Sequence, residues 1–265
     1  MSKMTDLFKA YLTNRKSELT VKNYLSTLER YEEWLRGKGP DEKNAEEFIM
    51  HLSLKGNSTR SLNRHLSALK TFFKKVLKRD LNIDGYLIEK NIPIWLLPDE
   101  QDKMIASCQS KYEKAIVVLF LKTGVRVSEA CTVTPDSFIK TPDGYYLKIM
   151  GKGSKERLIP TSEAVVQVVA DYVAISGTGD GVIFNRGVNE LEDVVQAVAK
   201  RAGIKKHVTC HKLRHSYASR YYAETKDIAA LRDNLGHSDI ATTGIYTHVD
   251  SVERLKKLPD SMKKA

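Results

Sequence analysis

A stretch of apolar, glycine and proline residues that lacks helical or strand periodicity divides this chain. It covers Asp84 to Pro98 (DGYLIEKNIPIWLLP) and contains one glycine and two prolines. Proline removes a backbone donor and glycine loosens the chain, so a helix or a central strand rarely continues through such a stretch. The pattern predicts two domains, at 1–84 and 99–265, joined by a linker at 85–98.

The first domain is expected to be helical throughout. Apolar residues recur at the three- and four-residue spacing of a helix between Val21 and Leu35, and again between Ala45 and Leu52. Ser58 can cap a further helix that runs to Arg79, with leucines and phenylalanine on its inner face. A bundle of helices is therefore predicted for this domain.

The last of these helices has an unusual charge pattern. Between Lys55 and Arg79 there are eight lysines or arginines and no acidic residue, in a chain whose formal net charge is +10. A solvated helix face is the ordinary alternative, but such faces usually mix both signs. We interpret this face as one that binds DNA phosphates. The residues expected to do so are Lys55, Arg60, Arg64, Lys70, Lys74, Lys75 and Lys78.

The second domain is expected to be mainly helical with one small β-hairpin. Two short strands, Tyr145–Met150 and Lys155–Ile159, flank the turn sequence GKGS. Helices are expected at 111–122, 162–175, 190–201, 211–223 and 226–235. The predicted fold class is mainly α with a small β-sheet or hairpin, in two domains.

Composition excludes several other classes of protein. Hydrophobic residues make up 42% of the chain, which is enough to build real cores. Three widely spaced cysteines indicate neither a disulfide framework nor a zinc site. The start of the chain has no apolar signal region, and the longest apolar run is far shorter than the ~20 residues that span a bilayer. We expect a cytoplasmic protein without membrane contacts.

Six residues in the second domain carry the chemistry needed to cut a phosphodiester without a metal ion. Arginine forks match phosphate oxygens, histidine moves protons near neutral pH, and tyrosine can be a covalent nucleophile. The six are Arg126, Lys152, His211, Arg214, His237 and Tyr246.

Each of these residues taken alone has an ordinary explanation: a surface arginine, a solvated turn lysine or a packed tyrosine. His211 and His215 have zinc-like spacing, but no acid or cysteine stands where it could complete such a site. Tyr146 occupies the position where a Walker A loop needs glycine, so no nucleotide site is predicted. Glu129, three residues after Arg126, can share a helical face with it and orient it.

The order of four segments, TGVRVSE, GKGSKERLIP, HKLRHSYA and LGHSDIATTGIYTH, resembles the tyrosine recombinases, especially the short Xer-like members. The resemblance covers nearly the whole chain and implies a helical core-binding domain, a linker and a catalytic domain. It implies that Arg126 and Arg214 hold the scissile phosphate and that Tyr246 attacks it. Ala130 stands where the family usually has a larger apolar residue, which concerns packing only.

The remaining roles also follow from the resemblance: Lys152 is the hairpin lysine, His211 and His237 are the active-site histidines, and Glu129 is a supporting acid. The expected product is a 3′-phosphotyrosyl link and a free 5′-hydroxyl, formed without a cofactor or metal. The expected partners are double-stranded DNA with an inverted-repeat site and three further copies of the chain, as a tetramer on two sites. The alternatives are a mobile-element integrase, a type IB topoisomerase that reseals the same strand, and a DNA-binding factor without catalysis.

Overall fold

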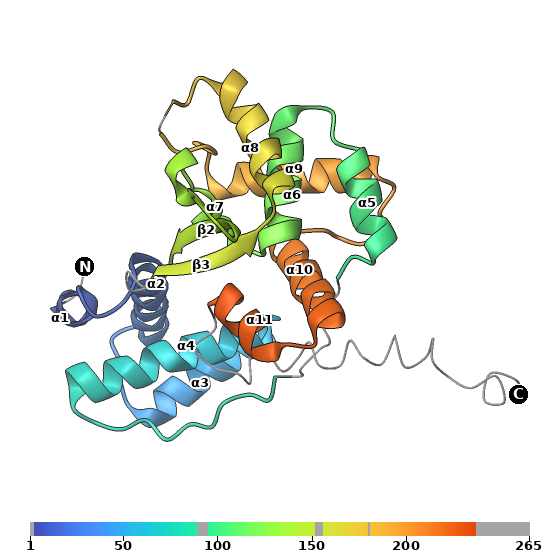
Figure 1. The fold of residues 1–265 in the computed structure, drawn as a ribbon. Coiled ribbons are helices and arrows are strands. Elements are labelled where there is room, and N and C mark those ends of the chain that lie inside the picture. The colour runs from blue at the N-terminus through green and yellow to red at the C-terminus, as the bar shows by residue number, and fades with distance from the viewer. Residues whose placement is uncertain (1–2, 89–94, 152–155, 180, 237–265) are drawn as a thin grey trace, which may run out of the picture. The chain divides into compact units, whose positions relative to one another are not determined.

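The chain folds into two compact units, residues 1–91 and 92–265, and the part of it that the structure describes is mainly helical with a small antiparallel sheet (Figure 1). The structure, a computed structural model, describes residues 3–88, 95–151, 156–179 and 181–236. The predicted fold class, mainly α with a small sheet, is confirmed. Among these residues, no helix combines the length and the apolar character that crossing a membrane requires.

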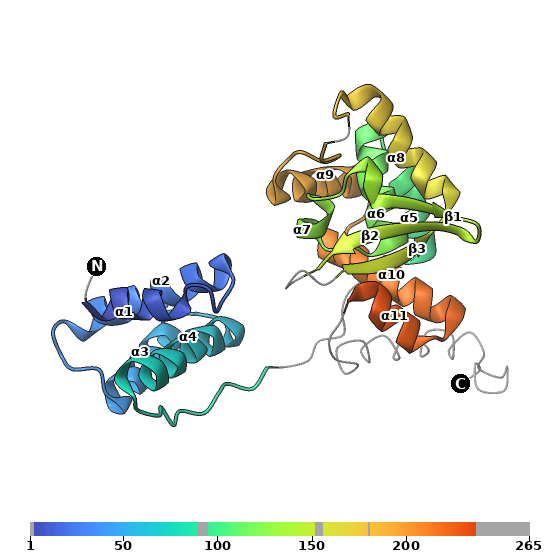
Figure 2. The same ribbon diagram turned by 60° about the vertical axis from the view of Figure 1, so that its left-hand side comes forward.

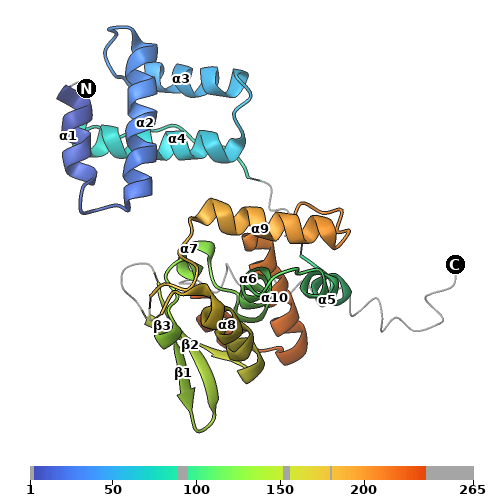
Figure 3. The ribbon, with the colours of Figure 1, turned by 90° about the horizontal axis from the view of Figure 1, so that it is seen from above.

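Unit 1 is a small bundle in which α3 and α4 run across α1 and α2 (Figure 3). Ser17, Asp41 and Ser58 each accept a hydrogen bond from a backbone N–H in the first turn of the helix that they precede. The elements are α1 (Lys3–Leu12), α2 (Glu18–Leu35), α3 (Glu42–Leu54), α4 (Thr59–Phe72) and a π-helical turn, η1 (Phe73–Leu77).

Aromatic side chains fill the centre of unit 1. The ring of Phe8 on α1 stacks on Tyr24 of α2 and meets the edge of Phe72 on α4, with ring centroids 6.4 and 5.4 Å away. Phe72 and Phe73 are both buried where the α-helix changes to π winding. Because these contacts join α1, α2 and α4, the basic outer face of α4 is held on a rigid element.

Unit 2 is built around α6. The elements are α5 (Pro98–Ala106), α6 (Lys111–Thr123), α7 (Val127–Ala130), a 3-10 turn η2 (Pro135–Ser137), β1 (Phe138–Thr141), β2 (Gly144–Met150), β3 (Glu156–Thr161), α8 (Glu163–Ser176), α9 (Val188–Arg201), α10 (Cys210–Thr225) and α11 (Ile228–Leu235). Every residue of α6 from Ala115 to Leu121 is buried, because α5, α8, α9, α10 and β3 pack around it.

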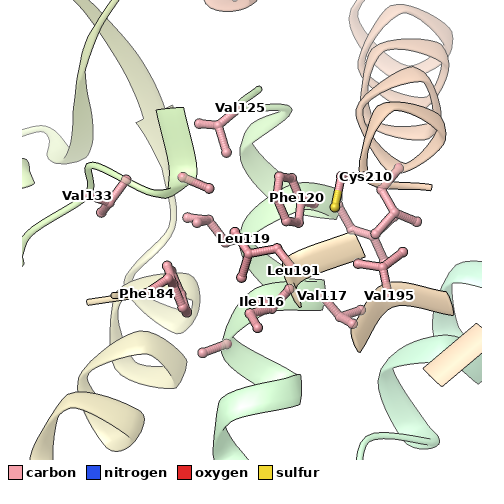
Figure 4. Close-up of a cluster of buried hydrophobic side chains, with 14 of the residues drawn as sticks. Ile116, Val117, Leu119, Phe120, Val125, Val133, Phe184, Leu191, Val195 and Cys210 are labelled. Carbon is pink, nitrogen blue, oxygen red and sulfur yellow. The ribbon is translucent and has the colours of Figure 1, made fainter. Parts of the chain in front are cut away.

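The core beneath the functional region lies between α6, α9 and the start of α10. Figure 4 shows Ile116 and Phe120 of α6 among Leu191 and Val195 of α9, with Cys210 of α10 beside them. All five side chains are buried. The C-terminal end of α6, and the residues just after it, are therefore fixed by close packing.

The sheet has three strands in the order β1-β2-β3, all antiparallel, with α8 packed on β2 and α11 on β3 (Figure 2). The predicted hairpin corresponds to β2 and β3, where Ile149 pairs with Arg157. Strand β1 was not predicted from the sequence, because it is four residues long and lacks a clean alternation of buried and exposed residues. The five helices predicted in this domain are confirmed, with small shifts of their ends.

Unit 1 also buries a histidine that the apolar pattern did not mark. His65 on α4 is 3% exposed, and its Nδ1 lies 2.9 Å from Thr27 Oγ1. Burial lowers the pKa of His65 to about 4, and the positive charges of Arg64 and Arg30 act in the same direction. The ring is therefore neutral in the folded protein at pH 7.

We predict that unit 1 loses stability in acid through His65. Its folded pKa lies below the usual 6.5, so the unfolded chain binds a proton that the folded chain does not, between pH 6.5 and 4. The contribution of neutral His65 to the free energy of unfolding should be fully present above pH 6.5. The free energy of unfolding should fall by about 2 kcal/mol on going from pH 7.5 to about pH 5. Urea unfolding followed by Trp34 fluorescence in a Trp95→Phe background measures it. The His65→Gln variant should lack this component of the pH dependence, and an identical slope in both proteins would contradict the prediction.

Candidate active site

Arg126 stands between the end of α6 and the short helix α7, where Glu129 holds it from two directions. Glu129 Oε2 accepts a hydrogen bond from the backbone N–H of Arg126 at 2.7 Å, and Oε1 accepts one from Arg126 Nη1 at 2.9 Å. The expected contact between these two residues is thus present. The side chain of Arg126 is 39% exposed and that of Glu129 is 6% exposed, so the arginine is fixed at its base and open at its tip.

Arg214 is the second arginine of the site, and it lies in the interior at 2% exposure. It projects from α10, and its two terminal nitrogens reach two different helix ends. Nη1 donates to Gly124 O at the end of α6, and Nη2 donates to Leu235 O at the end of α11, both at 2.6 Å. A guanidinium presents fixed donors in a plane, so these two bonds set its orientation.

The C-terminal end of α11 is where the arginines meet. Helix ends leave carbonyl oxygens without partners inside the helix, and these oxygens carry partial negative charge. Three successive carbonyls here each accept from a different arginine. Asn234 O accepts from Arg157 Nε at 2.9 Å, Leu235 O from Arg214 Nη2 at 2.6 Å, and Gly236 O from Arg126 Nη2 at 3.2 Å.

The sequence analysis did not single out Arg157, the third of these arginines. A charged residue on a short strand is usually solvated, but the side chain of Arg157 is only 11% exposed. Its Nη1 and Nη2 donate to Glu129 Oε1 and Oε2 at 2.8 and 2.7 Å. Its place in the segment GKGSKERLIP was the only available signal, and Lys152 was the one site residue predicted from that segment.

Glu129 is therefore a buried carboxylate shared by two guanidinium groups. Burial by itself would raise its pKa, but the hydrogen bonds from Arg157 and Arg126 outweigh that effect. The net result is a pKa below the usual range for glutamate, so this carboxylate is ionised at neutral pH. Its negative charge is what allows two arginine side chains to lie side by side.

His211 lies in the first turn of α10, three residues before Arg214, and is exposed to solvent. Partial desolvation lowers the pKa of His211, and the charges of Arg214 and Arg126 lower it further, against the opposing charge of Glu192. A neutral ring can accept a proton, which is what a general base requires. The ring of His215 meets that of His211 edge to face, with centroids 4.5 Å apart.

Tyr217 and Gly124 pack together behind the arginines. Gly124 ends α6 with a φ of 62°, and a Cβ atom there would lie 2.2 Å from the ring of Tyr217. The hydroxyl of Tyr217 accepts from Asn234 Nδ2 at 3.2 Å, and burial raises its pKa to about 12. Glycine at this position allows the carbonyl that binds Arg214 to come close to α10.

Three of the predicted site residues, Lys152, His237 and Tyr246, lie outside the described residues. His237 directly follows Gly236, whose carbonyl accepts from Arg126. Within the described ranges, no group of three or more histidine, cysteine or acidic side chains could hold a metal ion.

The predicted DNA-contacting residues all have exposed side chains. Lys74 is within 3.3 Å of Asp80, an ion pair so exposed that it contributes little. These predicted residues lie just after α3, on α4, and on or just after η1. They are Lys55, Arg60, Arg64, Lys70, Lys74, Lys75 and Lys78.

Comparison with protein families matches residues 95–253 to the phage integrase family, and residues 4–83 to the N-terminal SAM-like domain of phage integrases. A tyrosine recombinase of Thermosipho africanus is 30% identical to the chain, with both chains covered completely. Tyrosine recombinase XerA of Pyrococcus horikoshii is 29% identical, over 100% of this chain and 94% of the relative.

Solved structures share the fold. XerH recombinase in a post-cleavage complex with palindromic difH aligns with a TM-score of 0.78 at 21% identity, over 97% of this chain and 84% of that one. A lambda integrase tetramer bound to a Holliday junction aligns with a TM-score of 0.71 at 18% identity, over 92% of this chain and 76% of that one.

We predict that Gly124→Ala destabilises unit 2 much more than an equivalent change elsewhere. An alanine in the left-handed backbone conformation lowers the free energy of unfolding by about 1 kcal/mol, and the clash with Tyr217 should lower it by about 2 kcal/mol more. Gly177→Ala is the matched control, because Gly177 also ends a helix with a φ of 68° but a Cβ there would meet nothing within 4 Å. Thermal unfolding of both variants measures the difference. Equal melting temperatures for the two variants would contradict this prediction.

Proposed function

Because this chain belongs to the phage integrase family of tyrosine recombinases, which cleave and rejoin DNA strands, we propose that it is a Xer-like site-specific recombinase acting through a phosphotyrosine intermediate. Residues 1–84 would bind the core of the recombination site and residues 99–265 would carry out the reaction. The observation that supports this most directly is the convergence of Arg126 and Arg214 on one helix end.

Two guanidinium groups fixed at one place suit a scissile phosphate. The pentavalent transition state gathers negative charge on its nonbridging oxygens. Arg126 is already held by the carboxylate of Glu129 with its tip open, so it needs little reorganisation when that charge develops. Arg214 is buried and donates to two backbone carbonyls, so it has to turn a donor toward the phosphate when DNA binds. We assign both arginines to binding this phosphate and Glu129 to supporting Arg126.

The proton transfers are assigned to the other predicted residues. His211, with its lowered pKa, would accept the proton of Tyr246 as the hydroxyl attacks phosphorus. The bond to the 5′-oxygen then breaks, Lys152 protonates that oxygen, and His237 donates a hydrogen bond to a phosphate oxygen. The link to Tyr246 keeps the phosphodiester energy, so a 5′-hydroxyl of another strand can reverse the reaction and rejoin the DNA.

Tyr217, although close to the arginines, is not suited to be the nucleophile. It is 7% exposed, and its raised pKa opposes formation of the phenolate. Its hydroxyl is also engaged by Asn234. Tyr246 keeps the nucleophile role that the family pattern assigns.

The proposed partner is double-stranded DNA that carries an inverted-repeat recombination site. Recombination joins two duplexes and exchanges four strand ends, which calls for four protomers on two sites. A lambda integrase tetramer bound to a Holliday junction, which shares the fold, supports this assembly. We place the reaction in the cytoplasm, and the Xer-like relatives favour the resolution of chromosome or plasmid dimers over integration of a mobile element.

We predict that Tyr246 forms a covalent adduct with DNA in the presence of excess EDTA. On a nicked suicide substrate, the wild-type protein should give a protein–DNA species that protease shortens, and Tyr246→Phe should give none. Tyr217→Phe is the control and should still form the adduct. Mapping of the DNA-linked peptide to another tyrosine, or a requirement for an added divalent cation, would contradict this prediction.

Products from a plasmid with two sites distinguish the alternatives. A recombinase yields exchanged circles, whereas a topoisomerase only relaxes the plasmid and reseals the same strand. A DNA-binding factor without catalysis yields neither the adduct nor the exchange.

We predict that the basic face of α4 and η1 supplies much of the DNA affinity. Changing Arg60, Arg64, Lys74 and Lys75 together to glutamine should weaken binding and reduce the slope of log K against log salt by roughly 0.9 for each lost phosphate contact. The charge-matched control changes exposed lysines on α1, after it and on α3: Lys3, Lys9, Lys16 and Lys43. Equal salt slopes for the two quadruple variants would mean that the face is only solvated.

A further inference from the structure

We propose that Arg157 is a positioning residue for strand cleavage, which acts on the scissile phosphate only through Arg126 and the end of α11. This inference rests on the proposed function and adds to it a residue that the catalytic set does not contain. Arg157 joins the two parts of the site, the carboxylate of Glu129 and the end of α11.

Each of the three side-chain nitrogens of Arg157 donates a hydrogen bond inside the protein. Both oxygens of Glu129 accept from its terminal nitrogens at 2.8 and 2.7 Å, and Asn234 O accepts from its Nε at 2.9 Å. The side chain is 11% exposed, compared with 39% for Arg126. Arg126 is thus open to a DNA phosphate, whereas Arg157 is covered and turned inward.

The geometry makes Arg157 the link between Arg126 and α11. Glu129 fixes Arg126, and Arg157 donates to both oxygens of the same carboxylate while it holds the last turn of α11. A Cβ on Gly236 would lie 3.1 Å from Cδ of Arg157, so the chain leaves α11 directly against this side chain. The next residue is His237, and therefore Arg157 sets where that segment starts relative to Arg126.

Charge sharing gives the second part of the role. Two guanidiniums divide the attraction of one carboxylate, which leaves Arg126 able to donate to Gly236 O and to turn its exposed tip outward. Without Arg157, Glu129 would have one cationic partner, and the full Coulomb attraction would draw Arg126 onto both of its oxygens. The expected result is a site that binds DNA but holds the phosphate poorly.

The experiment compares Arg157→Met with wild type in single-turnover cleavage of the suicide substrate. The Kd for DNA should stay within about twofold, because Arg157 adds none of the phosphate contacts that dominate affinity. The rate of phosphotyrosine formation should fall about 100-fold, as expected for a small misplacement of catalytic groups. Arg157→Lys keeps the charge but cannot bridge both carboxylate oxygens and Asn234 O, so it should recover only part of the rate.

A substrate with a scissile methylphosphonate separates positioning from loss of structure. A methyl group there replaces one charged nonbridging oxygen, so the transition state carries less negative charge for Arg126 to stabilise. On this substrate, the rate of phosphotyrosine formation by Arg157→Met should be less than about tenfold below that of wild type. Arg201→Met is the matched control, since Arg201 likewise bonds one glutamate, Glu113, and one backbone carbonyl, that of Ser107. The Arg201→Met variant should have a changed melting temperature, but the ratio of its cleavage rates on the two substrates should equal that of wild type.

The outcomes are distinguishable. An Arg157→Met rate equal to wild type, or an equal loss on both substrates, would overturn this inference and leave the proposed function intact. Absence of any adduct with the wild-type protein would overturn the proposed function and this inference with it. Should Arg157→Met be unfolded at the assay temperature, Arg157→Lys takes its place, and a wild-type rate for that variant would overturn the inference.

Discussion

The buried carboxylate of Glu129 is the charge around which the active site is arranged. Two guanidinium groups, from Arg126 and Arg157, would repel each other if they lay this close without it. Removing one partner of such a buried pair commonly costs about 3–5 kcal/mol, because the remaining charge is left uncompensated. The carboxylate is in turn placed by α7, and it accepts a hydrogen bond from the backbone N–H of Arg126, the residue that precedes this helix. One short helix therefore decides where two arginines lie.

The second constraint is the end of α11, which brings together groups from distant parts of the chain. Its last carbonyls bind arginines from β3, α10 and the start of α7. Helix-end carbonyls would otherwise need water or a cap. Here they serve to fix the arginines, and the arginines fix the helix. Packing of α6 against α9 and α10 supplies the rigid base for this arrangement, and Gly124 permits the close approach of Tyr217.

Much of the fold and of the site could be predicted from local sequence patterns. The helices of both units follow from apolar periodicity, and the contact between Glu129 and Arg126 follows from a spacing of three residues. Patterns that depend on distant partners were missed. His65 is polar yet buried against Thr27, from another helix, and β1 is too short to show alternation. Nothing near Arg157 in the chain reveals that Glu129 and Asn234 surround it.

The sequence by itself determined the class of fold, most of its helices and the residue types that suit phosphate chemistry, because periodicity, caps and side-chain chemistry are local properties. Only the tertiary structure decided which arginines share a carboxylate, which is open to solvent and which is covered. Those properties depend on long-range contacts, such as that between Arg157 and Asn234, that exist only after α11 packs on β3. Burial then turns an ordinary strand arginine into part of the active-site framework.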